Sequence, residues 1–188
     1  MASGTREALL DAAARLLDAG GVEAVTLREV GRQAGVSHNA PYKHFPSKEA
    51  LLAAFAAREL ERRAARPEPS SSPAERLRDA LHSYVRWALD SPARFRLIFG
   101  PWTVDSTELH LAAEAAQARF VDTVAAAQQA GLLPAGDPIR LASLLRSLAH
   151  GAADLASAGH LAADGKGNAD PEDLVDDLLA HLRRGSQP

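Results

Sequence analysis

Apolar residues along the chain recur with the period of an α-helix. Over about residues 5–19 they fall at i, i+4, i+7 and i+8, which places them on one helical face. They are Leu9, Ala13, Leu16 and Leu17. The following Gly20 and Gly21 predict the end of this helix. No run alternates apolar and polar residues with β-branched side chains, as strands do, so the pattern predicts an all-α fold.

Capping signals predict where the other helices begin. Thr26 followed by Glu29 has the spacing of a capping box, and Val25 and Val30 are placed for a hydrophobic staple. The other predicted caps are Ser37, Ser47, Ser72, Ser91, Asp105, Asp137 and Asp170, and proline directly follows four of them. About nine helices are therefore expected, over residues 5–19, 27–34, a short stretch after 37, then 48–63, 73–90, 92–99, 106–130, 137–158 and 171–184.

A stretch rich in proline and serine, ARPEPSSSP at residues 65–73, is the clearest interruption of the helical pattern. It predicts two domains, one over residues 1–63 and the other over residues 73–184. A chain of 188 residues is long enough for two small domains and for a sizeable core. We expect four helices before the interruption and five after it.

Composition narrows the class of protein. Hydrophobic residues make up 46% of the chain and aromatic residues only 5%, so alanine and leucine, which favour helices, supply most of the apolar surface. With no cysteine, the chain has no disulfides, thiolate nucleophiles or cysteine-based metal sites. The sequence has no secretory signal pattern and no apolar segment long enough to cross a membrane, so we expect a cytoplasmic protein.

Charge is distributed unevenly, although the net charge of −3 alone argues against a nucleic-acid binder. Residues 1–66 carry ten Lys and Arg against eight Asp and Glu, whereas residues 67–188 carry eleven against sixteen. Only three of the 21 basic residues are lysines, and two of them, Lys43 and Lys48, lie in AGVSHNAPYKHFPSKEALL at residues 34–52. The positive end of the chain thus contains a basic, aromatic segment interrupted by prolines.

The predicted helix at residues 27–34, the turn at Gly35 and the short helix after Ser37 have the order of a helix-turn-helix. In such a unit the second helix enters the DNA major groove, and its ends are held on phosphates. We expect Phe45, which has no polar side-chain atom, to anchor this helix in the core. Side chains able to bind phosphates or base edges surround it. These candidate DNA-binding residues are Thr26, Ser37, His38, Asn39, Tyr42, Lys43, His44 and Lys48.

Each candidate has a role suited to its chemistry. His38 and Asn39 are expected at the exposed N-terminal end of the short helix, where base edges are met. Tyr42 offers a hydroxyl to a phosphate, and Lys48 adds a cation at the positive end of the next helix. In the alternative interpretation the lysines are ordinary solvated charges and His44 is a capping or core histidine.

The segment TLREVGRQAGVSHNAPYKHFPSKEALLAAF resembles the DNA-binding domain of the TetR family of bacterial transcriptional regulators. The resemblance covers about residues 5–62 and follows the family motif at Thr26, Val30, Ala34-Gly35-Val36-Ser37, Tyr42, Phe45 and Lys48-Glu49. It implies that Thr26, Tyr42 and Lys48 hold DNA phosphates. The segment AHGAADLASAGHL at residues 149–161 resembles a His-Gly-containing C-terminal subclass of the same family.

Pro41 departs from an ideal recognition helix. It lacks a backbone N–H and disfavours the helical conformation at Ala40, so a helix tolerates it only in the first turn. We therefore expect this helix to be short or tightened at its start, with Pro46 ending it.

Large aromatic residues gather in the second predicted domain. They are Tyr84, Trp87, Phe95, Phe99, Trp102 and Phe120. Core packing explains most of them, and the alternative is that some line a cavity for a small, largely apolar or aromatic molecule. The candidate ligand-binding residues are Tyr84, Trp87, Phe99, Trp102, Phe120 and His150. A hydrogen-bonded pair of His150 and Asp154 is favoured over a metal site, because no third ligand is evident, and no cofactor is expected.

Leucine stripes mark the last two predicted helices, and the resemblance implies that these helices pair across a two-fold axis. The candidate homodimer contacts are Leu144, Leu145, Leu148, Leu174 and Leu178. The resemblance also implies a repressor that binds a palindromic, double-stranded operator and leaves it when a small-molecule effector binds. Two rivals remain, a DNA-binding protein without an inducer and an enzyme that uses the C-terminal bundle. No catalytic constellation supports the enzyme.

Overall fold

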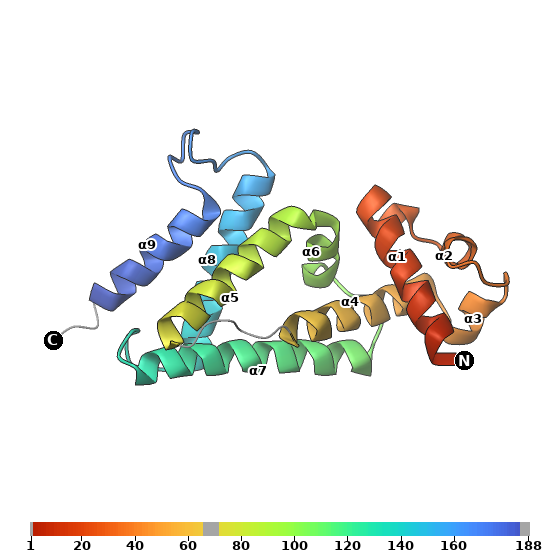
Figure 1. Cartoon of the computed structure of the whole chain (residues 1–188), viewed down its shortest axis with the longest axis horizontal. Coiled ribbons are helices and arrows are strands. Elements are labelled where there is room, and N and C mark those ends of the chain that lie inside the picture. Colours follow the sequence, from red (N-terminus) through yellow and green to blue (C-terminus); the bar gives the residue numbers. More distant parts are fainter. Residues whose placement is uncertain (1, 66–71, 185–188) are drawn as a thin grey trace. The chain divides into compact units, whose positions relative to one another are not determined.

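The computed structural model describes residues 2–65 and 72–184, and within them the chain forms helices and no strand (Figure 1). Nine helices occupy the described residues: α1 (Ala2–Ala24), α2 (Leu27–Gln33), α3 (Ala40–His44), α4 (Lys48–Ala64), α5 (Pro73–Asp90), α6 (Pro92–Phe99), α7 (Thr107–Gln129), α8 (Pro138–Ser157) and α9 (Pro171–Arg184). The predicted all-α fold is confirmed. Most of the predicted proline- and serine-rich interruption lies outside the described residues.

Contacts between helices divide the chain into two compact units. One unit joins Met1–Ala65 to Ala93–Ala116, and the other joins Arg66–Pro92 to Gln117–Pro188. We call them the N-terminal and the C-terminal unit. α7 is a single helix that begins in the N-terminal unit and ends in the C-terminal unit. α6 and the start of α7 thus group with the N-terminal helices, whereas the functional domain limits inferred from the sequence stay a prediction.

Side-chain caps begin five helices at the residues that the sequence indicates. In each of them a hydroxyl or carboxylate oxygen accepts a backbone N–H of the first turn at 2.8–3.2 Å. The five are Thr26 with Glu29, Ser47 with Ala50, Ser72 with Glu75, Asp137 with Ile139, and Asp170 with Asp173. Each cap satisfies a donor that has no partner within its helix, which stabilises the helix start.

Two of the predicted caps are wrong. Ser37 does not cap α3, because Asn39 occupies the residue before the helix, and no side chain makes a cap hydrogen bond there. The Ser37 carbonyl instead accepts the N–H of Ala40 at 2.9 Å within the preceding turn. Asp105 does not cap α7, because the neighbouring Ser106 hydroxyl accepts the N–H of Leu109 at 3.3 Å. At α7 two polar residues adjoin the helix start, and the path of the preceding turn decides which one lies next to the first helical N–H groups.

α1 is interrupted where the sequence predicts its end. Gly20 and Gly21 have non-helical backbone angles, and Gly21 has a φ of 69°. Glycine reaches this left-handed region without the steric cost that a side chain brings. A single further turn follows the interruption before the chain enters α2.

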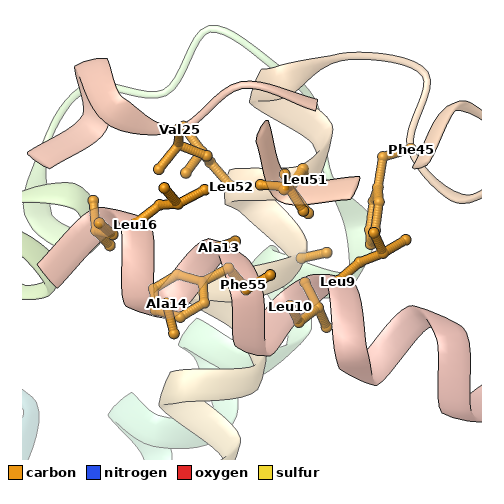
Figure 2. Close-up of a cluster of buried hydrophobic side chains, with 14 of the residues drawn as sticks. Leu9, Leu10, Ala13, Ala14, Leu16, Val25, Phe45, Leu51, Leu52 and Phe55 are labelled. Atoms are coloured by element: carbon orange, nitrogen blue, oxygen red, sulfur yellow. The ribbon is translucent and has the colours of Figure 1, made fainter. Parts of the chain in front are cut away.

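The core of the N-terminal unit lies between α1 and α4, with the end of α3 packed against it (Figure 2). Leu9 and Leu10 of α1 and Leu51 and Phe55 of α4 are fully buried. Phe45, directly after α3, is 3% exposed and belongs to the same cluster, so it anchors α3 as the sequence indicates. Burial of each such side chain stabilises the fold by roughly 1.5–3 kcal/mol.

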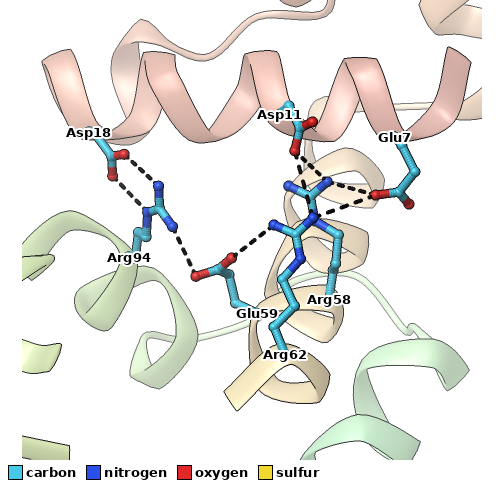
Figure 3. A network of polar contacts seen from close by, with 7 residues as sticks. All are labelled: Glu7, Asp11, Asp18, Arg58, Glu59, Arg62 and Arg94. Carbon is cyan, nitrogen blue, oxygen red and sulfur yellow. Dashed lines mark hydrogen bonds and ion pairs between the residues drawn. The ribbon is translucent and has the colours of Figure 1, made fainter. Parts of the chain in front are cut away.

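A buried arginine ties α4 to α1 (Figure 3). The side chain of Arg58 is 7% exposed and lies 3.0 Å from a Glu7 oxygen and 2.9 Å from an Asp11 oxygen. Its guanidinium carbon also lies 5.9 Å from the ring centre of Phe55. The Nε and Nη2 atoms of Arg58 make no hydrogen bond within the described residues. This cation therefore depends on two carboxylates and one aromatic ring.

Two further arginines hold α6 and the start of α7 to the N-terminal unit. Arg94 of α6 lies 2.6 Å from an Asp18 oxygen of α1 and 3.0 Å from a Glu59 oxygen of α4 (Figure 3). Its hydrogen bond to Asp18 is the main reason that the pKa of Arg94 is raised above its ordinary value. At the start of α7, Glu108 accepts two hydrogen bonds from Arg6 of α1 at 2.7 and 2.8 Å.

The core of the C-terminal unit is apolar and is built from α5, α7, α8 and α9. Its buried members include Leu81 and Val85 of α5, Val124 of α7, Leu145 of α8 and Val175 of α9. Large rings lie at its edge, because Tyr84 and Phe120 are only partly buried against it. Among the described residues, no helix is both long and apolar enough to cross a membrane.

Charged side chains also join α5 to α9. Arg78 donates two hydrogen bonds to Asp176, at 2.6 and 2.7 Å. The neighbouring His82 is 8% exposed, with Nδ1 2.8 Å from a Glu172 oxygen and Nε2 3.0 Å from an Asp176 oxygen. The hydrogen bond from Arg78 is the main cause that lowers the pKa of Asp176 below its ordinary value, and His82 lowers it further.

Candidate nucleic-acid interface

A tight turn between α2 and α3 completes the helix-turn-helix predicted from the sequence. Gly35 has a φ of 66°, in the left-handed region that favours glycine, and its N–H donates to the Arg32 carbonyl at 3.2 Å. The N–H of Val36 donates to the Gly31 carbonyl at 3.1 Å. These two bonds satisfy carbonyls at the end of α2 and reverse the chain towards α3.

α3 has five residues and carries Pro41 in its second position. The missing N–H of Pro41 costs no hydrogen bond there, since the first N–H groups of a helix have no partner within it. The carbonyl of Pro41 accepts the N–H of Phe45 at 2.9 Å and closes the last turn. The recognition helix is thus as short as the proline indicates.

Most of the candidate DNA-binding side chains lie on the exposed surface of this unit. The exposed ones are Thr26, Ser37, His38, Asn39, Tyr42 and Lys43, whereas His44 and Lys48 are half-buried. Tyr42 is 51% exposed, in contrast to the 3% of Phe45. The His38 ring lies 6.0 Å from that of Tyr42, so both rings belong to one face around α3. The helix-turn-helix therefore presents hydroxyl, amide, imidazole and ammonium donors together.

The start of α2 uses only half of the predicted capping box. The Thr26 hydroxyl accepts the N–H of Glu29, and its own O–H is left to donate. The Glu29 carboxylate pairs with Arg32, one turn further along α2. This hydrogen bond is the main cause that lowers the pKa of Glu29. The Glu29 carboxylate therefore offsets the positive charge of Arg32, which makes Arg32 a weaker candidate for a DNA contact.

Arg28 is a candidate that the sequence reasoning missed. It is exposed in the first turn of α2, two residues after Thr26, and among the described residues no acidic side chain forms an ion pair with it. An arginine at this place can bind phosphates or guanine edges. The sequence shows a basic residue close to the candidate Thr26. Only the structure shows that Arg32 forms an ion pair with Glu29 and that Arg28 differs from it in this respect.

Four of the six candidate ligand-binding residues lie in the C-terminal unit. The Tyr84 hydroxyl of α5 lies 2.8 Å from Nδ1 of His150 on α8, and the Tyr84 and Trp87 rings are 6.3 Å apart. Phe120 of α7 packs against the core of this unit. Nε2 of His150 lies 3.7 Å from an Asp154 oxygen, one turn along α8. A polar pair, Tyr84 with His150, thus lies among large rings.

Phe99 and Trp102 belong to the N-terminal unit. Trp102 packs against the core of that unit, and its Nε1 donates to the Ile98 carbonyl at 3.3 Å. Phe99 is 42% exposed, and its ring lies 5.0 Å from that of Phe95. The single aromatic cluster expected from the sequence is therefore divided between two compact units, because α6 and the start of α7 pack with α1 and α4.

The leucines proposed for the homodimer have unequal exposure. Leu144 of α8 is 67% exposed, whereas the adjacent Leu145 is 1% exposed and lies in the C-terminal core. The prediction that Leu145 contacts a second copy of the chain is therefore wrong, because its side chain lies on the face of α8 that packs into the core. Leu148 and Leu178 pack partly against the same core, and Leu174 is half-buried.

A short, exposed helix that follows a left-handed glycine turn on a helical chain is typical of a helix-turn-helix DNA-binding unit. Residues 9–55 match the family described as bacterial regulatory proteins, tetR family, and residues 77–182 match the Tetracyclin repressor-like, C-terminal domain. The second match alone covers more than half of the 188 residues. The chain belongs to the TetR family of DNA-binding transcriptional regulators.

Similar proteins support this assignment. The HTH-type transcriptional repressor KstR of Rhodococcus jostii (strain RHA1) is 40% identical over 83 residues, which span 43% of this chain and 39% of that protein. A protein of unknown function from Rhodococcus sp. RHA1 is 33% identical, with a TM-score of 0.81 over 97% of this chain and 96% of its own. The structure of AibR in complex with isovaleryl coenzyme A and operator DNA shares the fold, with 20% identity and a TM-score of 0.58 over 95% and 97% of the chains.

Proposed function

We propose that the protein is a homodimeric repressor that binds a two-fold symmetric operator and leaves it when a small apolar or aromatic effector binds. The exposed face of α3 is the observation that carries this proposal. There Tyr42 is 51% exposed and Lys43 is exposed, while Phe45 is 3% exposed and anchors the helix. The hydroxyl of Tyr42 and the ammonium group of Lys43 lie close together on a helix that Phe45 anchors. Both groups can donate hydrogen bonds to DNA phosphates.

Contacts with DNA are proposed to divide into two kinds. Thr26, Tyr42 and Lys48 bind phosphates, since each offers a donor near a helix start or on the exposed face of α3. His38 and Asn39, in the exposed turn that leads into α3, meet base edges in the major groove. The supporting donors are Ser37, Lys43, His44 and Arg28.

The homodimer is proposed to form through α8 and α9. Leu144 and Leu155 of α8 are 67% and 50% exposed. Burial of such apolar side chains against a second copy of the chain would stabilise a dimer. Leu148 of α8 and Leu174 and Leu178 of α9 complete the proposed contact. A two-fold dimer places its two recognition helices about 34–36 Å apart, the spacing of successive major grooves on one face of DNA.

Tyr84 and His150 are proposed to supply the polar contact of an effector within the C-terminal unit, with Trp87 and Phe120 of the same unit as its apolar contacts. Support comes from the 2.8 Å approach of the Tyr84 hydroxyl to His150 and from AibR, whose structure contains isovaleryl coenzyme A together with operator DNA. An effector can shift DNA binding only by its preference for the released state, and such coupling is typically about 1–3 kcal/mol.

Selection of bound duplexes from a randomised library tests the proposal. The selected sequence should be an inverted repeat, and it should protect both half-sites in a footprint. A Lys48→Ala substitution should weaken binding to all duplexes and lower the salt dependence by about one unit, because one phosphate contact is lost. Lys166→Ala, in the exposed loop before α9, is the matched control and should change neither.

Two results would count against the proposal. If no duplex is enriched by selection, operator binding fails. If effector candidates bind free and operator-bound protein equally in titration calorimetry, the protein is a DNA-binding regulator without that inducer, since coupling must be reciprocal. We propose no catalytic role for the C-terminal unit.

A further inference from the structure

We infer that Gly31 of α2 and Pro41 of α3 form a steric lock that sets the position of the recognition helix, and with it the base edges that this helix meets. The inference rests on the proposed binding of operator DNA by α3. It makes Gly31 and Pro41 positioning residues, because neither of them needs to touch DNA.

The contact between the two residues leaves no room for a side chain at residue 31. Pro41 is fully buried, and a β-carbon on Gly31 would lie 2.8 Å from Cγ and 3.4 Å from Cδ of the Pro41 ring. A flexible side chain could rotate away from such a contact. The proline ring can only pucker by a small amount, because it is closed onto its own backbone nitrogen.

Both partners are also held by their backbones. The Gly31 carbonyl accepts the N–H of Val36 at 3.1 Å, which fixes it to the turn. The Pro41 carbonyl accepts the N–H of Phe45 at 2.9 Å, and the Phe45 ring is buried in the core. The ring of Pro41 therefore moves only together with α3. A methyl group at residue 31 would displace α3 from α2 as a unit.

Such a displacement acts on specificity more than on general affinity. His38 and Asn39, the two proposed base-edge contacts, directly precede α3 and would move with it, and base-edge hydrogen bonds depend on position. Each well-formed base contact discriminates by about 5- to 150-fold. Binding to unrelated DNA depends mainly on the number of phosphate charges neutralised and tolerates a small shift.

The test compares Gly31→Ala, the double variant Gly31→Ala/Pro41→Ala and the wild type. The probes are a fluorescent duplex that the wild type selects from a randomised library and a scrambled duplex of the same composition, both measured by anisotropy. Gly31→Ala should bind the selected duplex at least about 10-fold more weakly and the scrambled duplex within about 2-fold of wild type. The double variant should recover most of the loss, because removal of the ring makes room for the methyl group.

Gly4→Ala is the matched control. A β-carbon on Gly4 in α1 meets nothing within 4 Å, so this change should leave binding to both duplexes unaltered. Alanine in place of glycine ordinarily favours a helix, so a loss at residue 31 but not at residue 4 identifies the contact with Pro41.

Three outcomes would overturn the inference. They are unchanged selectivity in Gly31→Ala, an equal loss on both duplexes, and a double variant no better than the single one. Melting temperatures of all variants show whether a loss comes from unfolding; recovery of both melting temperature and selectivity in the double variant supports the lock. Failure of the wild type to select any duplex would instead count against operator binding itself.

Discussion

The two compact units join their helices with the same kind of ion pair in different surroundings. In the N-terminal unit, the Arg58 side chain is 7% exposed between Glu7 and Asp11. In the C-terminal unit, the Arg78 side chain is 56% exposed and its partner Asp176 is 36% exposed. Water screens both partners of the second pair, whereas in the first pair only the carboxylates reach water, with Glu7 47% and Asp11 50% exposed.

The difference shows how strongly each of the two arginines depends on its acidic partners. The buried guanidinium of Arg58 lies 5.9 Å from the ring centre of Phe55, and two of its nitrogens lack hydrogen bonds within the described residues. Its positive charge is therefore tolerated only because two carboxylates lie beside it. Arg78 does not carry this constraint, because its side chain is largely in water.

The largest effect is expected from removal of both acidic partners of Arg58. Glu7→Gln combined with Asp11→Asn leaves a buried cation without a counter-charge, which should lower the free energy of unfolding by about 4 kcal/mol. Chemical denaturation at a fixed protein concentration measures the change. Arg58→Met should cost less than about 1 kcal/mol, because it removes the buried charge and keeps the apolar stem. Arg58→Met could instead lower the free energy of unfolding more than the double variant does. In that case the ion pairs of Arg58 would contribute more stability than the burial of its charge costs.

Adjacent leucines of α8 should behave oppositely. Leu145→Ala removes core packing and should cost about 3 kcal/mol in unfolding experiments. Leu144→Asp changes a side chain that is 67% exposed and should leave helix content intact, while sedimentation shows loss of the homodimer. A Leu144→Asp variant that remains dimeric would place the proposed contact on a different face.

The smallest effect is expected from the exposed pair. Arg78→Ala should lower the free energy of unfolding by less than about 1 kcal/mol near neutral pH, and Arg15→Ala, at an exposed arginine of α1, is the control.

The pKa of Asp176 lies below its ordinary value of 3.8 in the folded state. Its stabilising contribution is therefore fully present above that value and is lost as pH falls through the lower folded pKa. The difference in melting temperature between wild type and Arg78→Ala should shrink below about pH 4. A difference that grows on acidification would contradict this assignment.

Much of the secondary structure follows from local sequence, because a helix and its caps involve residues three or four positions apart. The spacing of Thr26 and Glu29 correctly marks the start of α2, and Gly35 marks the turn. Where several polar residues adjoin a helix start, as at Asp105 and Ser106, local spacing does not decide which one caps it. The direction of the incoming chain does, and that direction comes from packing elsewhere.

The candidate DNA-binding residues could be named from the sequence because one short segment carries them and the family motif orders them. Six of the eight are exposed, His44 and Lys48 are half-buried, and the roles of all eight on DNA stay predictions. Arg28 was missed because the sequence alone does not show that Arg32 is paired and Arg28 is not. The effector residues were harder to group, since 36 positions along the chain separate Tyr84 from Phe120 and the helices between them fold into both units.

By itself the sequence determined the all-α class, the approximate positions of the helices and the helix-turn-helix, since each depends on periodicity or on contacts within a few residues. Tertiary structure alone decided that Leu145 faces the core beside an exposed Leu144, that α6 belongs with the N-terminal helices, and that Pro41 fits against Gly31. Each of these depends on which atoms from distant positions come within contact distance. A sequence pattern shows which face of a helix is apolar, but it does not show which of two adjacent residues is buried. Close packing in the folded chain decides that.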